Sequence, residues 1–213
     1  MSDTTAYDPT EIERVMKTSP VIPVLVIEDA GRAREQAEAL VEGGLKVLEV
    51  TLRTPQALDA IKRMNLVPGA IVGAGTITDP RDLHEALGVG AEFIVSPGLT
   101  ERLGEAAVAS GVPFLPGIAT AGDIMRGRDL GLSHFKFFPA MAAGGIPALQ
   151  ALAAPFHQCR FCPTGGITQT NARDWLALPS VLCVGGSWVV PKDAGLDEIR
   201  ALARAASALT HTP

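Results

Sequence analysis

The sequence predicts an α/β fold, a (β/α)8 barrel with an additional N-terminal helix. Eight short apolar or β-branched runs recur along the chain at a spacing of roughly 20 to 27 residues. The segments between these runs carry apolar residues at helical intervals, so strands and helices alternate. Eight such units close a parallel barrel whose strands are buried on both faces. An open doubly wound sheet is the competing fold, but no G-x-G-x-x-G fingerprint follows the first run.

The eight expected strands share a short apolar stretch that gives way to glycine, proline or threonine, the residues that mark turns. They are VIPVLVI from residue 21, KVLEVTL from 46, AIVGAG from 70, EFIVSPG from 92, VPFLPGI from 112, HFKFFPA from 134, CRFCPTGGI from 159 and VLCVGG from 181.

Caps and periodicity indicate the helices. The segment GRAREQAEALVEGG from residue 31 carries apolar residues on one face. In DPRDLHEALGVG, Asp79 can cap the helix and Pro80 suits its first turn. We expect DPTEIERVMKTS, from residue 8, to form an extra helix that covers the bottom of the barrel. The last barrel helix is expected in LDEIRALARAASAL, from residue 196.

Composition limits the partners and the location. The chain has 213 residues without a linker or low-complexity tract, so residues 1–213 are expected to form a single domain. Its 18 Lys and Arg against 23 Asp and Glu give a net charge of −5, and without a basic block we expect no nucleic-acid partner. The sequence has neither an apolar run of the roughly 20 residues that span a bilayer nor the layout of a signal peptide. We therefore expect no membrane association and a cytoplasmic location.

The cysteines and histidines do not suggest a metal site. Cys159, Cys162 and Cys183 are expected to be reduced thiols in the core, because the CRFC pair lacks two further zinc ligands and does not open a helix. The histidines are scattered: we expect His84, His157 and His211 to be solvated and His134 to be packed or capping. Without a cluster at ligand spacing, neither a metal nor a cofactor is expected.

Lys136 stands in the apolar run HFKFFPA, where removal from water favours the neutral amine that a nucleophile requires. A lysine at a strand end whose stem covers apolar surface is the alternative. Glu49 alternates with Val47 and Thr51 on the barrel-lining face, as a proton shuttle or as a structural ion-pair partner of Lys136. Both interpretations bring Glu49 near Lys136.

The strand ends carry candidate binding groups, because the carboxyl ends of barrel strands form the active site. Arg53 follows the second strand, where its planar guanidinium suits a carboxylate, and Thr76 ends the motif GAGT. Two glycine pairs follow the last two strands, where barrels commonly bind phosphate through backbone N–H groups. These candidates are Thr164, Gly165, Gly166, Gly185, Gly186 and Ser187. Tight turns that merely need glycine are the alternative.

Together the motifs EVTLRTPQAL, GAGTI, VSPG, KFFPA, PTGGI and VGGSW resemble, in order and spacing over nearly the whole chain, the family of 2-keto-3-deoxy-6-phosphogluconate (KDPG) and 4-hydroxy-2-oxoglutarate (KHG) aldolases. The family has the TIM-barrel fold, needs no cofactor and is typically a homotrimer. The resemblance implies that Lys136 forms a Schiff base with the substrate ketone and that Glu49 relays protons. It further implies roles in substrate binding for Arg53, Thr76, Pro97, Phe138, Thr164, Gly165, Gly166, Gly185, Gly186 and Ser187.

The expected function is therefore cleavage of 2-dehydro-3-deoxy-6-phosphogluconate to pyruvate and glyceraldehyde 3-phosphate in the Entner–Doudoroff pathway, with 4-hydroxy-2-oxoglutarate as a further substrate. A phosphosugar isomerase or epimerase would share the phosphate loops but would not use Lys136. A non-catalytic phosphosugar-binding barrel would gain nothing from burying both Glu49 and Lys136. The sequence leaves open the choice among the gluconate substrate, its galactonate epimer and the non-phosphorylated keto acid.

Overall fold

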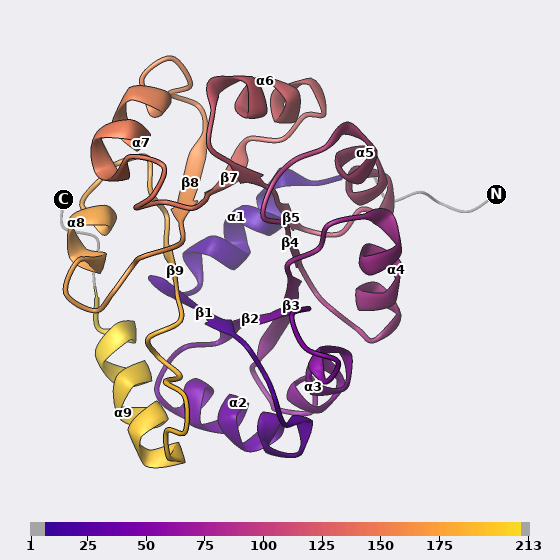
Figure 1. Ribbon diagram of the computed structural model, residues 1–213, viewed down its shortest axis with the longest axis vertical. Coiled ribbons are helices and arrows are strands. Elements are labelled where there is room, and N and C mark those ends of the chain that lie inside the picture. The colour runs from indigo at the N-terminus through magenta and orange to yellow at the C-terminus, as the bar shows by residue number, and fades with distance from the viewer. Residues whose placement is uncertain (1–6, 210–213) are drawn as a thin grey trace.

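The structure, a computed structural model, describes residues 7–209, and it is a parallel α/β fold with helices outside and strands inside (Figure 1). His211, which the sequence predicts to be solvated, lies outside the described residues. The strands are β1 (Val21–Leu25), β2 (Val47–Thr51), β3 (Ile71–Gly75), β4 (Ile94–Val95), β5 (Phe114–Leu115), β6 (Gly117–Ile118), β7 (His134–Phe137), β8 (Arg160–Pro163) and β9 (Val184–Gly186). The helices are α1 (Pro9–Lys17), the short 3-10 helix η1 (Ala30–Arg32), α2 (Ala33–Glu42), α3 (Ala57–Met64), α4 (Pro80–Gly88), α5 (Glu101–Ser110), α6 (Ala121–Asp129), α7 (Gly145–Ala153), α8 (Ala172–Leu176) and α9 (Leu196–Ser207).

The strands form two parallel sheets. One has the order β5-β4-β3-β2-β1-β9 and the other the order β6-β7-β8. In the larger sheet, Val24 of β1 is the register partner of Glu49 on β2. Because neighbouring strands are parallel, their carboxyl ends share one edge, and the loops that leave this edge lie together.

The expected fifth strand is divided into β5 and β6 by Pro116, which has no N–H to donate to a ladder. Its carbonyl still accepts a hydrogen bond of 2.8 Å from the Lys136 N–H of β7. At the opposite margins, isolated parallel bridges pair Phe161 with Val181 and Thr164 with Gly185, so β8 lies beside β9. The two sheets are thus adjacent at both of their margins.

The predicted helix starts are confirmed by their hydrogen bonds. Asp79 accepts from the backbone N–H groups of Arg81 and Asp82 at the start of α4, with Pro80 as the first helical residue. Asp8 accepts from the N–H of Thr10 in the same way at the start of α1. In the described range, no helix is long and apolar enough to cross a membrane.

Buried side chains form two apolar clusters. The larger one packs the strands against the surrounding helices. The smaller one fills the space enclosed by the strands and includes Ile22, Val47, Phe93, Leu115 and Cys162, together with Ile12, Val15 and Met16 of α1. Helix α1 therefore covers the interior at the amino-terminal ends of the strands, and Figure 1 shows it inside the ring of the other helices. The opposite, carboxyl-terminal ends of the strands are left for a site.

Candidate active site

Lys136 and Glu49 meet in the interior. Lys136 lies on β7 and Glu49 on β2, and the amine Nζ is 3.0 Å from the carboxylate Oε1. The two residues are only 5% and 3% exposed, respectively. The predicted proximity of this pair is confirmed, and the alternative of a lysine whose head reaches water is wrong. A buried amine beside a carboxylate combines a nucleophile with a group that can accept or deliver its proton.

Phe138 covers the amine from one side. The Lys136 Nζ lies 5.4 Å from the centre of the Phe138 ring, within the range of a cation–π contact. On the side toward α1, the apolar cluster of the interior closes the space.

The rim residues follow the carboxyl ends of different strands. Arg53 follows β2 and is exposed, whereas Thr76 follows β3 and is half-buried. Pro97 follows β4 and Ser187 follows β9, and both are exposed. Thr76 has a left-handed backbone with φ of 63°, which is strained for a β-branched residue. Such strain is commonly retained at functional sites.

Glycine is required for different reasons at the four positions that end the last two strands. Gly165 and Gly166 have positive φ angles of 102° and 76°, so their turn requires glycine. This turn follows β8 directly, at the end of the strand that lies beside β9. Gly185 lies where a Cβ would overlap the Thr164 hydroxyl, and Gly186 lies where a Cβ would overlap the ring of Trp188.

A cavity of about 430 Å³ adjoins this end of the sheet beside Ser187. Of the predicted site residues only Ser187 lines it, and Lys136 and Glu49 do not. Its charged lining residues are Glu28, Asp29, Arg32, Lys192 and Asp193. The cavity therefore places two cations near Ser187, although acidic groups flank them.

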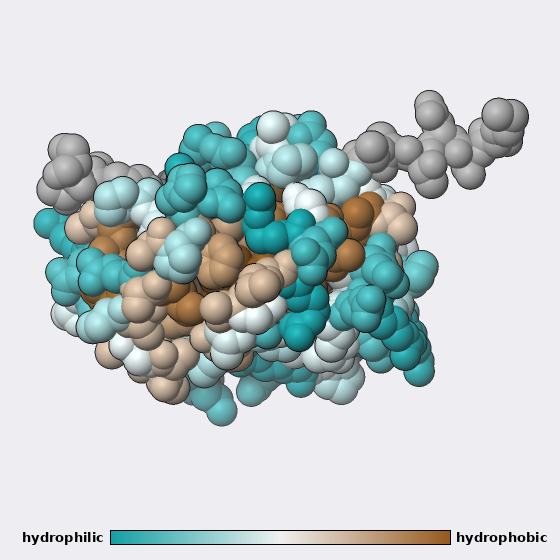
Figure 2. All heavy atoms as spheres, turned by 90° about the horizontal axis from the view of Figure 1, so that it is seen from above, coloured by the Kyte–Doolittle hydropathy of each residue, from teal (hydrophilic) through white to brown (hydrophobic). Residues whose placement is uncertain are grey.

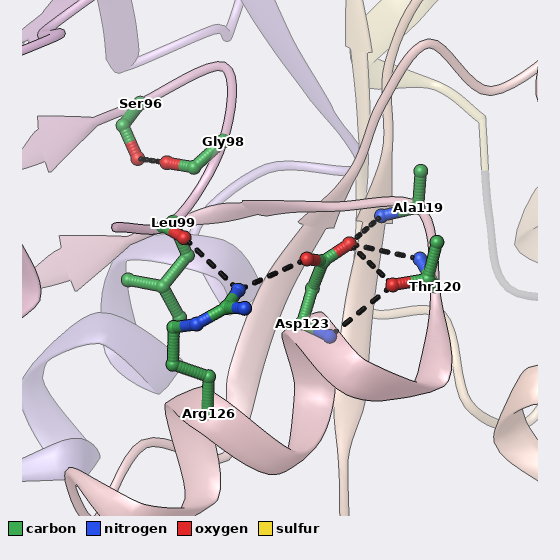
Figure 3. A network of polar contacts seen from close by, with 7 residues as sticks. All are labelled: Ser96, Gly98, Leu99, Ala119, Thr120, Asp123 and Arg126. Atoms are coloured by element: carbon green, nitrogen blue, oxygen red, sulfur yellow. Dashed lines mark hydrogen bonds and ion pairs between the residues drawn. The ribbon is translucent and has the colours of Figure 1, made fainter. Parts of the chain in front are cut away.

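The loop that carries Pro97 is tied to α6 by a polar network (Figure 3). Arg126 donates through one nitrogen to the Leu99 carbonyl at 3.2 Å and to the Asp123 carboxylate at 3.1 Å. The same carboxylate accepts from the backbone N–H of Thr120 at 3.0 Å and from its hydroxyl at 2.8 Å. Burial alone would raise the pKa of Asp123, but these hydrogen bonds and that from the Ala119 N–H outweigh it and lower the pKa.

The cysteines and His134 lie in the core. All three cysteines are free and buried. Burial, with further contributions from the Cys162 thiol and the Glu49 carboxylate, raises the pKa of the Cys183 thiol well above its ordinary value. His134 is buried at the foot of β7, 3.5 Å from Glu13 of α1, and burial lowers its pKa. Among the described residues, no group of three or more acidic, histidine or cysteine side chains could hold a metal ion.

Sequence reasoning overlooked two interior glycines. Gly75 lies on β3 where a Cβ would overlap the Glu49 carboxylate, and Gly117 lies where a Cβ would overlap the Pro97 carbonyl. Both positions were visible in the sequence as glycine within an apolar strand, a pattern that indicates close approach by another group. Only tertiary structure identifies the group.

Comparisons with known proteins agree with this geometry. A family model described as KDPG and KHG aldolase matches residues 12–202. The 2-dehydro-3-deoxy-phosphogluconate aldolase of Zymomonas mobilis is 59% identical over 199 residues, which cover 93% of this chain and 96% of that protein. The KHG/KDPG aldolase of Escherichia coli is 54% identical over 202 residues, covering 92% and 95% of the two chains.

Solved structures are also similar. The crystal structure of the Zymomonas mobilis aldolase with 3-phosphoglycerate has a TM-score of 0.94 at 57% identity, covering 96% of this chain and 98% of that chain. The KDPG aldolase of Legionella pneumophila, with pyruvate captured as a covalent carbinolamine intermediate, has a TM-score of 0.90 at 46% identity. That match covers 92% of this chain and 98% of the Legionella chain.

Proposed function

This chain belongs to the KDPG and KHG aldolase family, and from that premise we propose its reaction and the residues that carry it. The protein is a class I aldolase that cleaves 2-dehydro-3-deoxy-6-phosphogluconate to pyruvate and glyceraldehyde 3-phosphate in the Entner–Doudoroff pathway. The observation that supports this most directly is the contact between the Lys136 amine and the Glu49 carboxylate, 3.0 Å apart and buried. The carbinolamine captured in the Legionella relative is an intermediate of the same kind of chemistry.

The proposed reaction begins at Lys136. Its neutral amine attacks the C2 ketone, and loss of water from the carbinolamine gives an iminium that accepts electrons from the C3–C4 bond. Glu49 takes the proton of the C4 hydroxyl as this bond breaks, which releases glyceraldehyde 3-phosphate and leaves an enamine on Lys136. Protonation of the enamine carbon and hydrolysis of the imine then release pyruvate. Glu49 serves both proton transfers because it changes protonation state between them.

We assign the ends of the substrate to opposite parts of the rim. Arg53 and Thr76 bind the carboxylate of the pyruvate portion, while Pro97 and Phe138 line the pocket. Thr164, Gly165, Gly166, Gly185, Gly186 and Ser187 face the rest of the substrate and its phosphate. The positive φ angles of Gly165 and Gly166 form a tight turn that an anion can approach closely, which supports a phosphate site at that end.

We further propose that residues 1–213 form one closed, eight-stranded TIM barrel with α1 as its cover. Only Pro116 separates β5 of the larger sheet from β6 of the smaller one, so the chain runs directly from one sheet to the other. The bridges between β8 and β9 support closure at the other margin. We propose a cytoplasmic homotrimer. Exposed Met125 of α6 and Met141 before α7 support an interface, and Figure 2 shows apolar side chains gathered between hydrophilic ones on the face seen from above.

Trapping by borohydride tests the Schiff base. Borohydride added with pyruvate should inactivate the enzyme irreversibly and add the mass of reduced pyruvate at Lys136. Lys136→Arg should abolish both turnover and labelling while the protein stays folded, because arginine remains protonated. A label on another lysine, or turnover by the arginine variant, would exclude the assignment. A phosphosugar isomerase or a binding protein would give no label.

Specificity constants for the gluconate substrate, its galactonate epimer and 4-hydroxy-2-oxoglutarate would establish the breadth of the activity. Sedimentation of the purified protein would test the trimer, since a monomer contradicts it.

A further inference from the structure

We propose that Gly75 is a positioning residue for catalysis: the absence of a side chain there makes the space in which the Glu49 carboxylate lies beside Lys136. The inference rests on the proposed role of Glu49 in proton transfer. It concerns a residue of β3 that has no side chain of its own and that acts through the Glu49 carboxylate.

The geometry around Gly75 is specific to one neighbour. A Cβ built on Gly75 would overlap the Glu49 Oε1 and would lie 2.7 Å and 2.8 Å from Glu49 Cγ and Cδ. These three atoms are the nearest to the added carbon, and they all belong to Glu49. Since Cγ is involved as well as the oxygen, rotation of the terminal carboxylate cannot relieve the overlap. The whole side chain would have to leave its present position.

The backbone does not require glycine at this position. The φ angle of Gly75 lies outside the left-handed region, unlike that of Thr76, which follows it. Alanine could therefore adopt the strand conformation of β3 without backbone strain. The remaining reason for glycine is the space that Glu49 occupies.

Displacement of Glu49 would break a buried contact. Its Oε1 lies 3.0 Å from the Lys136 Nζ, and both residues are almost fully removed from water. A shift of about 1 Å in a catalytic group can lower the rate about 10²-fold, because the reacting atoms no longer meet in the required geometry. Gly75→Ala should therefore affect proton transfer, although the nucleophile stays in place.

Gly73 provides a control on the same strand and the same face: it is the register partner of Glu49 on β2, but a Cβ there would meet another side chain. A Cβ on Gly73 would lie 2.5 Å from carbons of the Phe93 ring, which belongs to the interior apolar cluster and not to the site. Gly73→Ala should therefore lower the melting temperature but leave kcat within about threefold. Gly88→Ala, on the exposed surface of α4 with no atom within 4 Å of the added carbon, should leave kcat unchanged and should not lower the melting temperature, because alanine favours the helix.

The kinetic test compares Gly75→Ala with Glu49→Gln on the phosphorylated keto acid. We expect Gly75→Ala to lose about 10²-fold in kcat with little change in KM, while borohydride and pyruvate still label Lys136. The double variant Gly75→Ala/Glu49→Gln should have the same kcat as Glu49→Gln alone, because both changes act through the Glu49 carboxylate. Normal kcat in Gly75→Ala, additive losses in the double variant, or an equal loss of kcat in Gly73→Ala would overturn the proposal.

A stability measurement tests the proposal even if Gly75→Ala folds poorly. Gly75→Ala should lower the urea midpoint of the wild-type chain. It should not lower the midpoint of the Glu49→Ala variant, which lacks the atoms that the added Cβ would overlap. An equal fall in both backgrounds would overturn the inference. If Glu49→Gln itself turns over normally, the proposed role of Glu49 in proton transfer fails. If Lys136 is not labelled, the proposed Schiff-base function fails. Both outcomes are distinguishable from a failure of the inference about Gly75.

Discussion

At the scale of single residues, the unusual feature is an amine and a carboxyl group in contact within an apolar interior. Removing one partner of such a pair leaves the other buried and unpaired, which is strongly unfavourable. Lys136 and Glu49 are each nearly excluded from solvent, so neither is explained by surface solvation. A pair that adds little net stability over apolar side chains is more readily explained by chemistry.

Glu49→Gln should lower kcat about 10²- to 10⁴-fold, as expected for the loss of a general acid–base. Glutamine keeps the shape of the side chain but cannot accept the C4 hydroxyl proton. The imine with pyruvate should still form, as borohydride trapping and mass spectrometry would record. Normal turnover would mean that Glu49 is only a structural partner of Lys136.

Ser187→Ala should discriminate between substrates. Loss of one hydroxyl donor to a charged group corresponds to about 10- to 150-fold in kcat/KM for the phosphorylated keto acid. For 4-hydroxy-2-oxoglutarate, which has no phosphate, the same change should be nearly silent. Equal losses on both substrates would mean that Ser187 supports the rim and does not bind phosphate.

At the scale of elements, the rim loops are held by hydrogen bonds from neighbouring helices. The N-terminus of α6 carries a capping box in which Thr120 and Asp123 bond reciprocally. Arg126 extends this arrangement to the loop after β4 through the Leu99 carbonyl. The start of α6 and the loop that carries Pro97 are therefore one polar unit (Figure 3).

Asp123→Ala should lower the free energy of unfolding by about 1 kcal/mol at pH 7, because backbone N–H groups of the cap lose their acceptor. The folded-state pKa of Asp123 is lowered, so its stabilisation is complete above the ordinary value of 3.8 and is lost as the pH falls through the lower folded value. The difference between variant and wild type should thus shrink below pH 3.8.

Urea unfolding at several pH values would measure this dependence, with Asp129→Ala at the exposed end of α6 as the control. A difference that stays constant with pH would contradict the assigned role of the carboxylate.

At the scale of the whole molecule, stability and chemistry occupy opposite ends of the interior. Helix α1 covers the amino-terminal ends of the strands with Ile12, Val15 and Met16, while the candidate site lies toward the carboxyl-terminal ends. This separation allows the rim to carry a strained Thr76 and a buried charged pair, because the other end is closed by ordinary apolar packing.

Ile12→Ala should lower the free energy of unfolding by about 2–5 kcal/mol, the usual effect of a large-to-small change in a core. The side chain is fully buried, and its removal leaves a cavity under the strands. The kcat of the folded fraction should not change. Glu11→Ala, which removes an exposed ion pair with Arg14, should change stability by at most about 1 kcal/mol. Equal effects of the two variants in thermal unfolding would show that α1 does not seal the interior.

The alternation of strands and helices, and the positions at which the strands end, could be predicted from the amino-acid sequence alone. Local causes specify these features: apolar runs, the Asp79 cap with Pro80, and glycines at turns. The sequence also predicted that Glu49 and Lys136 would meet, because Glu49 alternates with lining residues and a buried charge needs a partner.

The reasons for glycine at two interior positions became visible only in the tertiary structure. The reason for Gly75 is the side chain of Glu49 on another strand, and the reason for Gly185 is the hydroxyl of Thr164. No local pattern encodes these distances, because they arise only when strands far apart in the sequence pack around one interior.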